Sequence, residues 1–261
     1  MGDFNVNKLL VTSFLTAAAL VPLPTVAQSP AVKVPGIPRL PDEKPNFTGV
    51  WAGPAFTHEV GPNDTDAPHI TGFDRKKMSP FLPGAEARYR QANNGDLRHD
   101  DPTALCMPDG HPREALAPYA TQIVQTPDMM VILYEYMHFS RIIPINKRHP
   151  QDVELTFMGD AVAKWDGDTF VIDTIGLKEW PLSASNLWHS DALHTIERLR
   201  HTDPTTVSYE ITIDDPKVFT KPWSQEFQMK LHRTWALLEQ VCEENNRCEG
   251  GTCIPSEGQK K

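Results

Sequence analysis

The clearest pattern in the sequence is an alternation of apolar and polar residues that starts near residue 121 and recurs in short segments to about residue 238. Successive side chains of a strand point to opposite faces, so this period of two predicts strands with one buried face. In 207–213, for example, the odd-numbered residues are apolar and the even-numbered residues are polar. The second half of the chain is therefore expected to be β-structure.

Turn signals separate these segments and pair them. Pro127-Asp128, Asp166-Gly167 and Asp203-Pro204 each lie between two alternating runs, and Asp-Gly is a strong hairpin signal. The predicted strands are 123–125 with 129–143, 160–164 with 169–174, and 193–200 with 207–213, while 227–238 reads as a last strand or a closing helix. An antiparallel meander of this length is expected to close into an all-β barrel, with a β-sandwich as the alternative.

The first half of the chain has a different organisation. Residues 1–27 resemble a signal peptide, with Lys8 before an apolar run and Thr25-Val26-Ala27 at the cleavage site. Residues 28–45 form a proline-rich extended leader, and we expect one domain over 46–246, followed by a polar tail over 247–261. Much of 52–122 reads as long loops, with a short helix predicted within 83–93. The protein is thus predicted to be secreted or periplasmic.

Four cysteines remain after the predicted cleavage, and export permits disulfides. Cys248 and Cys253 flank a Gly-Gly turn and are expected to close a small loop. That pairing leaves Cys106 to reach Cys242. A cysteine metal site is the weaker reading, because the spacings lack the paired C-x-x-C of zinc sites.

Charge narrows the classes of partner. The chain has 34 acidic residues against 25 Lys and Arg, a formal net charge of −9. Nucleic-acid binding needs clustered basic residues, so no nucleic-acid partner is expected. The apolar run of the predicted signal peptide is too short for a bilayer anchor, so no membrane span is expected after cleavage. A small molecule is the expected partner, and the sequence leaves the oligomeric state open.

The densest group of ionisable residues runs from His189 to His201. His189 precedes a predicted strand, where it is expected to reach a ligand at the mouth of the barrel and act as a general acid or base. Glu197 and Arg198 are neighbours on that strand, so only one of them can point inward. Arg141 is expected to stabilise an anion, and Glu197 to orient His189. The candidate catalytic residues are therefore His189, Arg141, Glu197 and Arg198.

A second set of residues is expected to contact the substrate. Glu135 and Arg141 share the parity of Val131 and Leu133 in 129–143, which places charges on an apolar face where a partner or a function is needed. The candidate substrate-binding residues are Glu135, Tyr136, His138, Asp173, Trp188 and His194.

Signatures of other chemistries are missing from the sequence. It contains no G-x-S-x-G, no G-x-x-x-x-G-K and no G-x-G-x-x-G, so no cofactor is expected. A metal held by His189, Asp191 and His194 is the weaker alternative, because H-x-D-x-x-H at the entry to a strand is not a recognised ligand spacing. We therefore expect no metal.

Several motifs occur in one order along the chain: Cys106-x-Pro108-x-Gly110, Trp165-x-Gly167-Asp168-Thr169-x-Val171-x-Asp173-Thr174, and His189-Ser190-x-x-Leu193 with Glu197-Arg198. Together they resemble a family of secreted bacterial proteins of unassigned function over roughly residues 46–246. The tripeptide Gly49-Val50-Trp51 is similar to the first-strand signature of lipocalin-like barrels. These resemblances imply a secreted β-rich domain with a lipocalin-like barrel, and no mechanism.

Three functions fit this pattern. The leading hypothesis is an exported, cofactor-independent enzyme that acts on a small, partly apolar or aromatic molecule by acid–base chemistry, as a lyase, dehydratase or isomerase does. The alternative is a periplasmic protein that binds a small ligand in the same cavity without catalysis. The third is a structural envelope protein.

Overall fold

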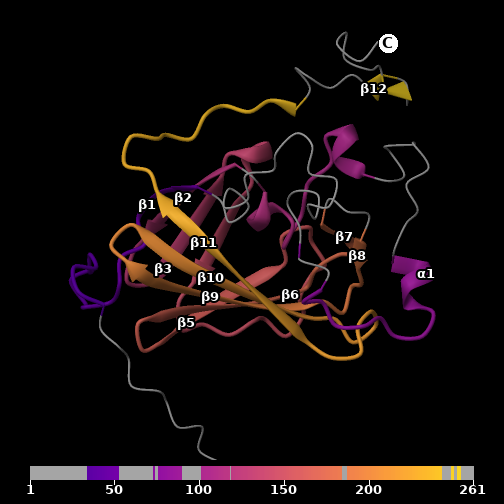
Figure 1. Ribbon diagram of the computed structural model, residues 1–261, viewed down its shortest axis with the longest axis horizontal. Helices are drawn as coiled ribbons and strands as arrows, with labels where there is room; N and C mark the ends of the chain where they lie inside the picture. The colour runs from indigo at the N-terminus through magenta and orange to yellow at the C-terminus, as the bar shows by residue number, and fades with distance from the viewer. Residues whose placement is uncertain are drawn as a thin grey trace, which may run out of the picture. The chain divides into compact units, whose positions relative to one another are not determined.

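A nine-stranded antiparallel sheet dominates the fold (Figure 1). The structure, a computed structural model, describes residues 34–52, 73, 76–89, 101–117, 119–183, 187–242, 248–249 and 252–253. In spatial order the strands are β4 (Ser140–Pro144), β3 (Met129–Tyr134), β2 (Ala120–Gln125), β1 (Gly49–Ala52), β11 (Trp223–Leu231), β10 (Thr206–Asp214), β9 (His194–Asp203), β6 (Thr169–Ile175) and β5 (Asp160–Asp166).

The sheet is nearly closed. Its two terminal strands, β4 and β5, meet just beyond β4, where Ile145 forms a single parallel bridge with Ala163 and the Asn146 amide donates to the Ala163 carbonyl at 2.7 Å. Within this barrel, neighbouring strands are those that follow one another along the chain. The first and last strands of the sheet along the chain, β1 and β11, also pair with each other. The predicted antiparallel all-β barrel is confirmed, in place of the sandwich.

Smaller elements lie outside this sheet. They are the hairpins β7 (Trp180–Ser183) with β8 (Leu187–His189) and β12 (Cys248–Glu249) with β13 (Thr252–Cys253), the helix α1 (Ala85–Tyr89), and the 3₁₀ helices η2 (Pro102–Leu105), η3 (Glu114–Leu116) and η4 (Tyr136–His138). Helix α1 falls within the helix predicted over 83–93, and residues 90–93 lie outside the described part of the chain. Among the described helices, none has the length and apolarity needed to cross a bilayer.

The inner face of the barrel follows the alternation in the sequence. In β10 the odd-numbered residues predicted to be buried are at most 4% exposed. The Gly49-Val50-Trp51 tripeptide begins β1, and Trp51 is 1% exposed with its indole Nε1 donating to the Phe47 carbonyl at 2.8 Å. In β10 the apolar positions of the period-two pattern are thus the ones that pack inside.

The prediction of one strand over 129–143 was wrong. The chain turns back through η4 and forms two paired strands, β3 and β4. Met137 and His138 have positive φ angles of 51° and 54°, which no continuous strand accommodates. Parity therefore does not carry from Glu135 to Arg141, and the buried residues of β3 are Met130, Ile132 and Tyr134 rather than Val131 and Leu133.

The ends of the chain are only partly described. The predicted signal peptide lies outside the described residues, while 34–45 folds against the barrel and Arg39 pairs with Asp168 at 2.7 Å. The segment 227–238 contains the end of β11 and then continues without a helix. Cys106 and Cys242 form the predicted disulfide, with Cα atoms 5.7 Å apart. The backbone pairs Cys248 with Cys253, whose side chains are outside the described part.

Candidate functional site

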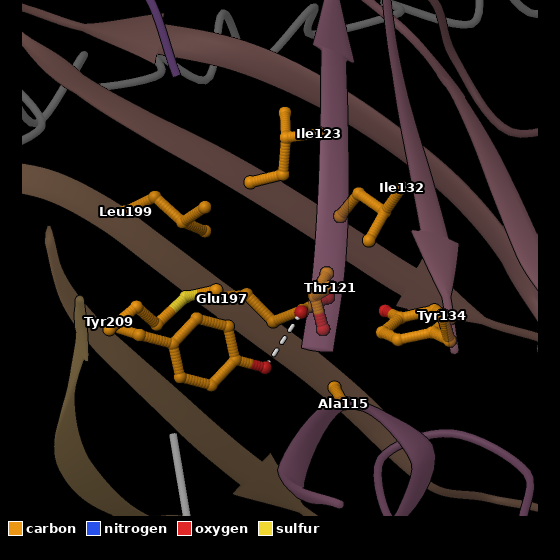
Figure 2. Close-up of a pocket in the computed structure, with 9 residues that line it drawn as sticks. Ala115, Thr121, Ile123, Ile132, Tyr134, Glu197, Leu199 and Tyr209 are labelled. Atoms are coloured by element: carbon orange, nitrogen blue, oxygen red, sulfur yellow. Dashed lines mark hydrogen bonds between the residues drawn. The ribbon is translucent and has the colours of Figure 1, made fainter. Parts of the chain in front are cut away.

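The interior of the barrel contains a small cavity. It is lined mainly by apolar side chains, with Glu197 and Tyr209 hydrogen-bonded at its edge and Tyr134 across from them (Figure 2). About 20 Å³ is open to the centre of a water molecule, which is room for about one water. This cavity is too small for the organic ligand that the sequence led us to expect inside the barrel.

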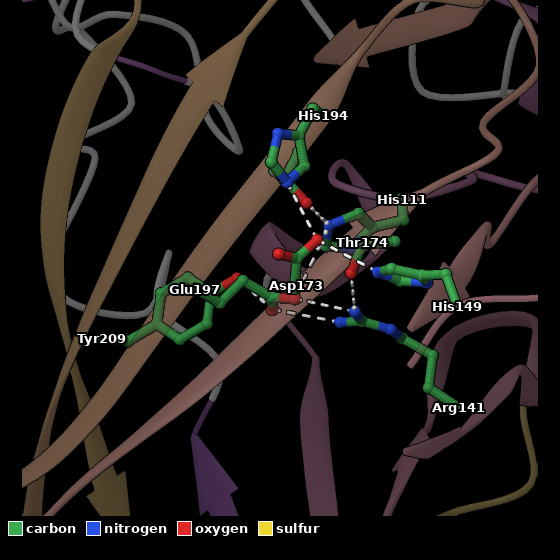
Figure 3. Close-up of polar contacts among 9 residues, drawn as sticks. His111, Arg141, His149, Asp173, Thr174, His194, Glu197 and Tyr209 are labelled. Carbon is green, nitrogen blue, oxygen red and sulfur yellow. Dashed lines mark hydrogen bonds and ion pairs between the residues drawn. The ribbon is translucent and has the colours of Figure 1, made fainter. Parts of the chain in front are cut away.

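Beside the cavity lies an inner cluster of polar residues: His111, Arg141, Thr174, Glu197 and Tyr209 (Figure 3). Arg141 on β4 donates from Nη1 and Nη2 to the two carboxylate oxygens of Glu197 on β9, at 3.0 and 2.7 Å. Its Nη2 also donates to the Thr174 hydroxyl at 2.8 Å, and the Tyr209 hydroxyl donates to Glu197 at 2.8 Å. The two charges of this buried pair thus compensate each other, with further hydrogen bonds to side chains of two other strands, β6 and β10.

Electrostatics keep this pair ionised. Burial would raise the pKa of Glu197, but the Arg141 guanidinium outweighs it and lowers that pKa to about 2. Burial lowers the pKa of His111 to about 3, with Arg141 adding to the effect, so this imidazole is neutral. His111 Nε2 lies 2.9 Å from the Thr195 hydroxyl and 3.7 Å from Glu197. We conclude that the inner cluster is a fixed ion pair with a neutral imidazole beside it.

The segment that carries His111 also buries two acidic residues, which the sequence reasoning missed. Arg113 pairs with Asp101 at 2.8 Å and with Asp109 at 2.9 Å. Glu114 is 2% exposed, and neither of its carboxyl oxygens has a hydrogen-bond partner among the described residues. Burial raises the pKa of Glu114 to about 9 and that of Asp109 to about 6. Glu114 is therefore mainly protonated at neutral pH.

A second group of polar residues, the outer cluster, consists of His149, Asp160, Asp173 and His194 (Figure 3). Asp173 Oδ1 lies 2.9 Å from His194 Nε2 and 3.1 Å from His149 Nε2. The other ring nitrogen of His149, Nδ1, lies 2.5 Å from Asp160 Oδ1. The four side chains are 19–41% exposed, so solvent and solutes can reach them.

Strand register gives the outer cluster partly apolar surroundings. Asp173 on β6 is opposite Val162 of β5 and Ile196 of β9, and residues in register share a face of the sheet. Gly159 brings Asp160 close to β6, because a Cβ at this position would lie 2.7 Å from the Ile175 carbonyl oxygen. Its φ of +70° also favours glycine. The outer cluster therefore combines acid–base groups with partly exposed apolar side chains.

Of the predicted catalytic residues, Arg141 and Glu197 come together, but as a buried ion pair with no open side toward a ligand. Arg198 points outward, with 43% of its side chain exposed beside Asp166 and Glu210, so it cannot join them. As predicted, these two neighbours on β9 face opposite sides.

His189 does not lie in an exposed loop. It ends β8 and is 1% exposed, with Nδ1 donating to the Ser190 carbonyl. Asp215 draws this segment inward by accepting hydrogen bonds from the Ser190 amide and hydroxyl, both at 2.7 Å. Burial lowers the pKa of His189 to about 4. A role as general acid or base at the mouth of the barrel does not fit this position.

The three residues considered as a metal site have separate partners. His189 contacts Ser190, Asp191 pairs with Lys217, and His194 contacts Asp173. The sequence alternative therefore does not assemble around one ion.

The predicted substrate-binding residues are not gathered in one place. Asp173 and His194 belong to the outer cluster. Glu135 and His138 accept hydrogen bonds from the Leu238 and Gln240 amides. The remaining two stack on aromatic neighbours: Tyr136 on Tyr119, and Trp188 edge-on to Trp180. His149 and Asp160 were missed, although the His-Pro of 149–150 and the acidic start of the predicted strand at 160 were visible in the sequence.

Comparison with known protein families and with characterised proteins finds no match to this chain. The family and lipocalin resemblances thus stay predictions, and the case for a function depends on the geometry of the two clusters.

The inner ion pair generates a first prediction. Replacing Arg141→Met leaves the Glu197 carboxylate buried without its cation, which should lower the free energy of unfolding by about 3–5 kcal/mol in urea denaturation. The double variant Arg141→Met/Glu197→Gln also removes the unpaired carboxylate charge, so it should recover part of the lost free energy of unfolding. A double variant whose loss of unfolding free energy exceeds the sum of the losses in the two single variants would contradict a paired role.

Glu114 generates a second prediction. Its pKa is raised in the folded state, so its contribution to stability is complete below the unfolded pKa and is lost as the pH rises toward about 9. The protein should lose about 1 kcal/mol of stability per pH unit between pH 7 and 9, above the range where histidines titrate. Urea denaturation of Glu114→Gln should show a much flatter profile. An unchanged slope in this variant would refute the assignment.

Proposed function

We propose that the protein is an enzyme that transfers protons on a small, partly apolar molecule, and that the outer cluster does this chemistry. The observation that carries the proposal is the shared oxygen of Asp173, which holds one nitrogen of His149 and one of His194. Chains of alternating carboxylates and imidazoles are a common way to orient and tune acid–base groups. The chemistry that such residues offer is proton transfer, which needs no cofactor.

Hydrogen-bond roles in the outer cluster suggest which group is the base. An ionised carboxylate only accepts hydrogen bonds, so His149 and His194 must both present Nε2–H to Asp173. Neutral His194 then has its lone pair on Nδ1, and Figure 3 shows this nitrogen directed away from Asp173. His194 is the proposed base, and Asp173 stabilises the imidazolium that forms when Nδ1 takes a proton.

His149 is the proposed orienting group, because both of its ring nitrogens face carboxylates: Nε2 lies 3.1 Å from Asp173 Oδ1 and Nδ1 lies 2.5 Å from Asp160 Oδ1. It thereby holds the Asp173 carboxylate in place beside His194. In an isomerisation, His194 Nδ1 would remove a proton from one carbon and return it to a second carbon. In an elimination, it would pass the proton taken from carbon to the leaving group.

Accessibility favours the outer cluster over the inner cluster. His189, Arg141 and Glu197 are at most 3% exposed, and the adjacent cavity has room for about one water. The outer cluster is open, and Val162 and Ile196 offer an apolar surface for part of a substrate. We therefore place the acid–base chemistry on the outside of the barrel rather than at its mouth.

We also propose that the protein acts after export. The basic and apolar start of the sequence, with small residues at 25–27, supports this location. The Cys106–Cys242 disulfide is compatible with an oxidising compartment.

The test is solvent deuterium exchange. The protein is incubated in D₂O with a panel of aryl- and alkyl-substituted 2-oxo and 3-hydroxy acids, and loss of C–H signal is followed by proton NMR. His194→Gln keeps a donor toward Asp173 but removes the base, so it should slow exchange at least about 100-fold at unchanged melting temperature.

Arg198→Gln is the matched control, because Arg198 is exposed on the same face of β9 and lies outside the cluster. Its exchange rate should equal that of the unmodified protein. Equal rates for the His194 variant and the unmodified protein would overturn the proposal, as would a panel in which no compound exchanges.

A further inference from the structure

A groove separate from both clusters lies where the chain leaves β11. The segment after this strand, with Ala120 at the start of β2 and Glu135 just after β3, borders an open groove of about 350 Å³. The described residues that line the groove are Ala120, Glu135, Thr234, Trp235, Ala236 and Leu238. This volume lies in the range of small-molecule sites, unlike that of the interior cavity.

Hydrogen bonds hold the walls of the groove in place. Glu135 accepts from the Leu238 amide at 2.9 Å, and the Gln240 side chain accepts from the Met137 amide at 2.8 Å. Two residues further on, the Cys106–Cys242 disulfide fastens the segment to the 101–117 region. These hydrogen bonds and the disulfide therefore fix the position of the segment that forms one wall of the groove.

The lining combines apolar surface with one charge. Trp235 and Leu238, both in the lining, are 40% and 69% exposed, so they present apolar surface to solvent. The His232 and Trp235 rings are stacked, with their centroids 3.6 Å apart, and this contact orients the indole. Among the six lining residues only Glu135 is charged, and its charge is negative. An indole face and a carboxylate both attract cations.

We propose that this groove binds a small organic cation, an ammonium group carried on an aromatic or alkyl body. The body would pack on Trp235 and Leu238, and the ammonium would lie near the Glu135 carboxylate. The net charge of −9 on the chain favours a cation over an anion of the same shape. None of these residues belongs to the outer cluster, so this proposal and the proposed proton-transfer activity can fail separately.

The experiment is a calorimetric titration of the full chain with 2-phenylethylammonium chloride. Its neutral and anionic counterparts, 2-phenylethanol and phenylacetate, have the same ring. The ammonium compound should bind saturably, the alcohol at least about 2-fold more weakly, and phenylacetate not at all. Equal affinity for the three compounds, or no binding of the ammonium compound, would overturn the proposal.

Two variants locate the site. Glu135→Gln keeps an acceptor for the Leu238 amide but removes the charge, and should weaken binding about 2- to 5-fold. Trp235→Leu removes the indole and should weaken it similarly. Glu239→Gln is the control, because it removes the same charge from the same segment without lining the groove. An equal loss in the Glu239 variant would mean that general electrostatics alone attract the probe, and unchanged binding in either groove variant would refute the site.

Discussion

The Arg141–Glu197 ion pair is the interaction on which the barrel depends most. The backbone joins the β4 side of the sheet to β5 by a single bridge, so main-chain pairing between strands is weakest along this seam. Arg141 projects from β4, on one side of the seam, and its hydrogen-bond partners Thr174 and Glu197 belong to β6 and β9 on the other side. Side-chain hydrogen bonds through the interior thus join strands that the backbone barely joins. A buried pair is costly to form, and its tight geometry here is what repays that cost.

The same strands also position the outer cluster. Thr174 and Asp173 are neighbours on β6, and they point to opposite faces of the sheet. On β9, Thr195 contacts His111 inside while His194 contacts Asp173 outside. Fixing the inner side chains therefore fixes the direction of the outer ones. A slip of one residue in the pairing of β6 with β9 would exchange the two clusters, which the buried charges would oppose strongly.

Local pattern was enough to predict most of the barrel, because alternation and Asp-Gly turns act over a few residues. It failed at β3 and β4, where Met137 and His138 turn the chain although nothing in their residue types signals a positive φ. Asp173 and His194 were correctly singled out, yet His149, the second imidazole that contacts Asp173, comes from a loop before β5. Contacts between residues so far apart along the chain depend on strand order, which period-two patterning does not specify.

Burial explains why the predicted catalytic histidine was misplaced. The sequence places His189 among polar residues and so suggests an exposed loop, but Asp215 binds the amide and hydroxyl of Ser190 and draws the segment inside. The disulfide has a comparable long-range effect, since it joins the 101–117 segment, which buries His111 and Glu114, to the segment that lines the groove. The unexpected burial of His189 and of the 101–117 segment thus goes with partners more than twenty residues away in the chain. Residue chemistry identified the groups able to act, and these distant partners decide which of them remain accessible.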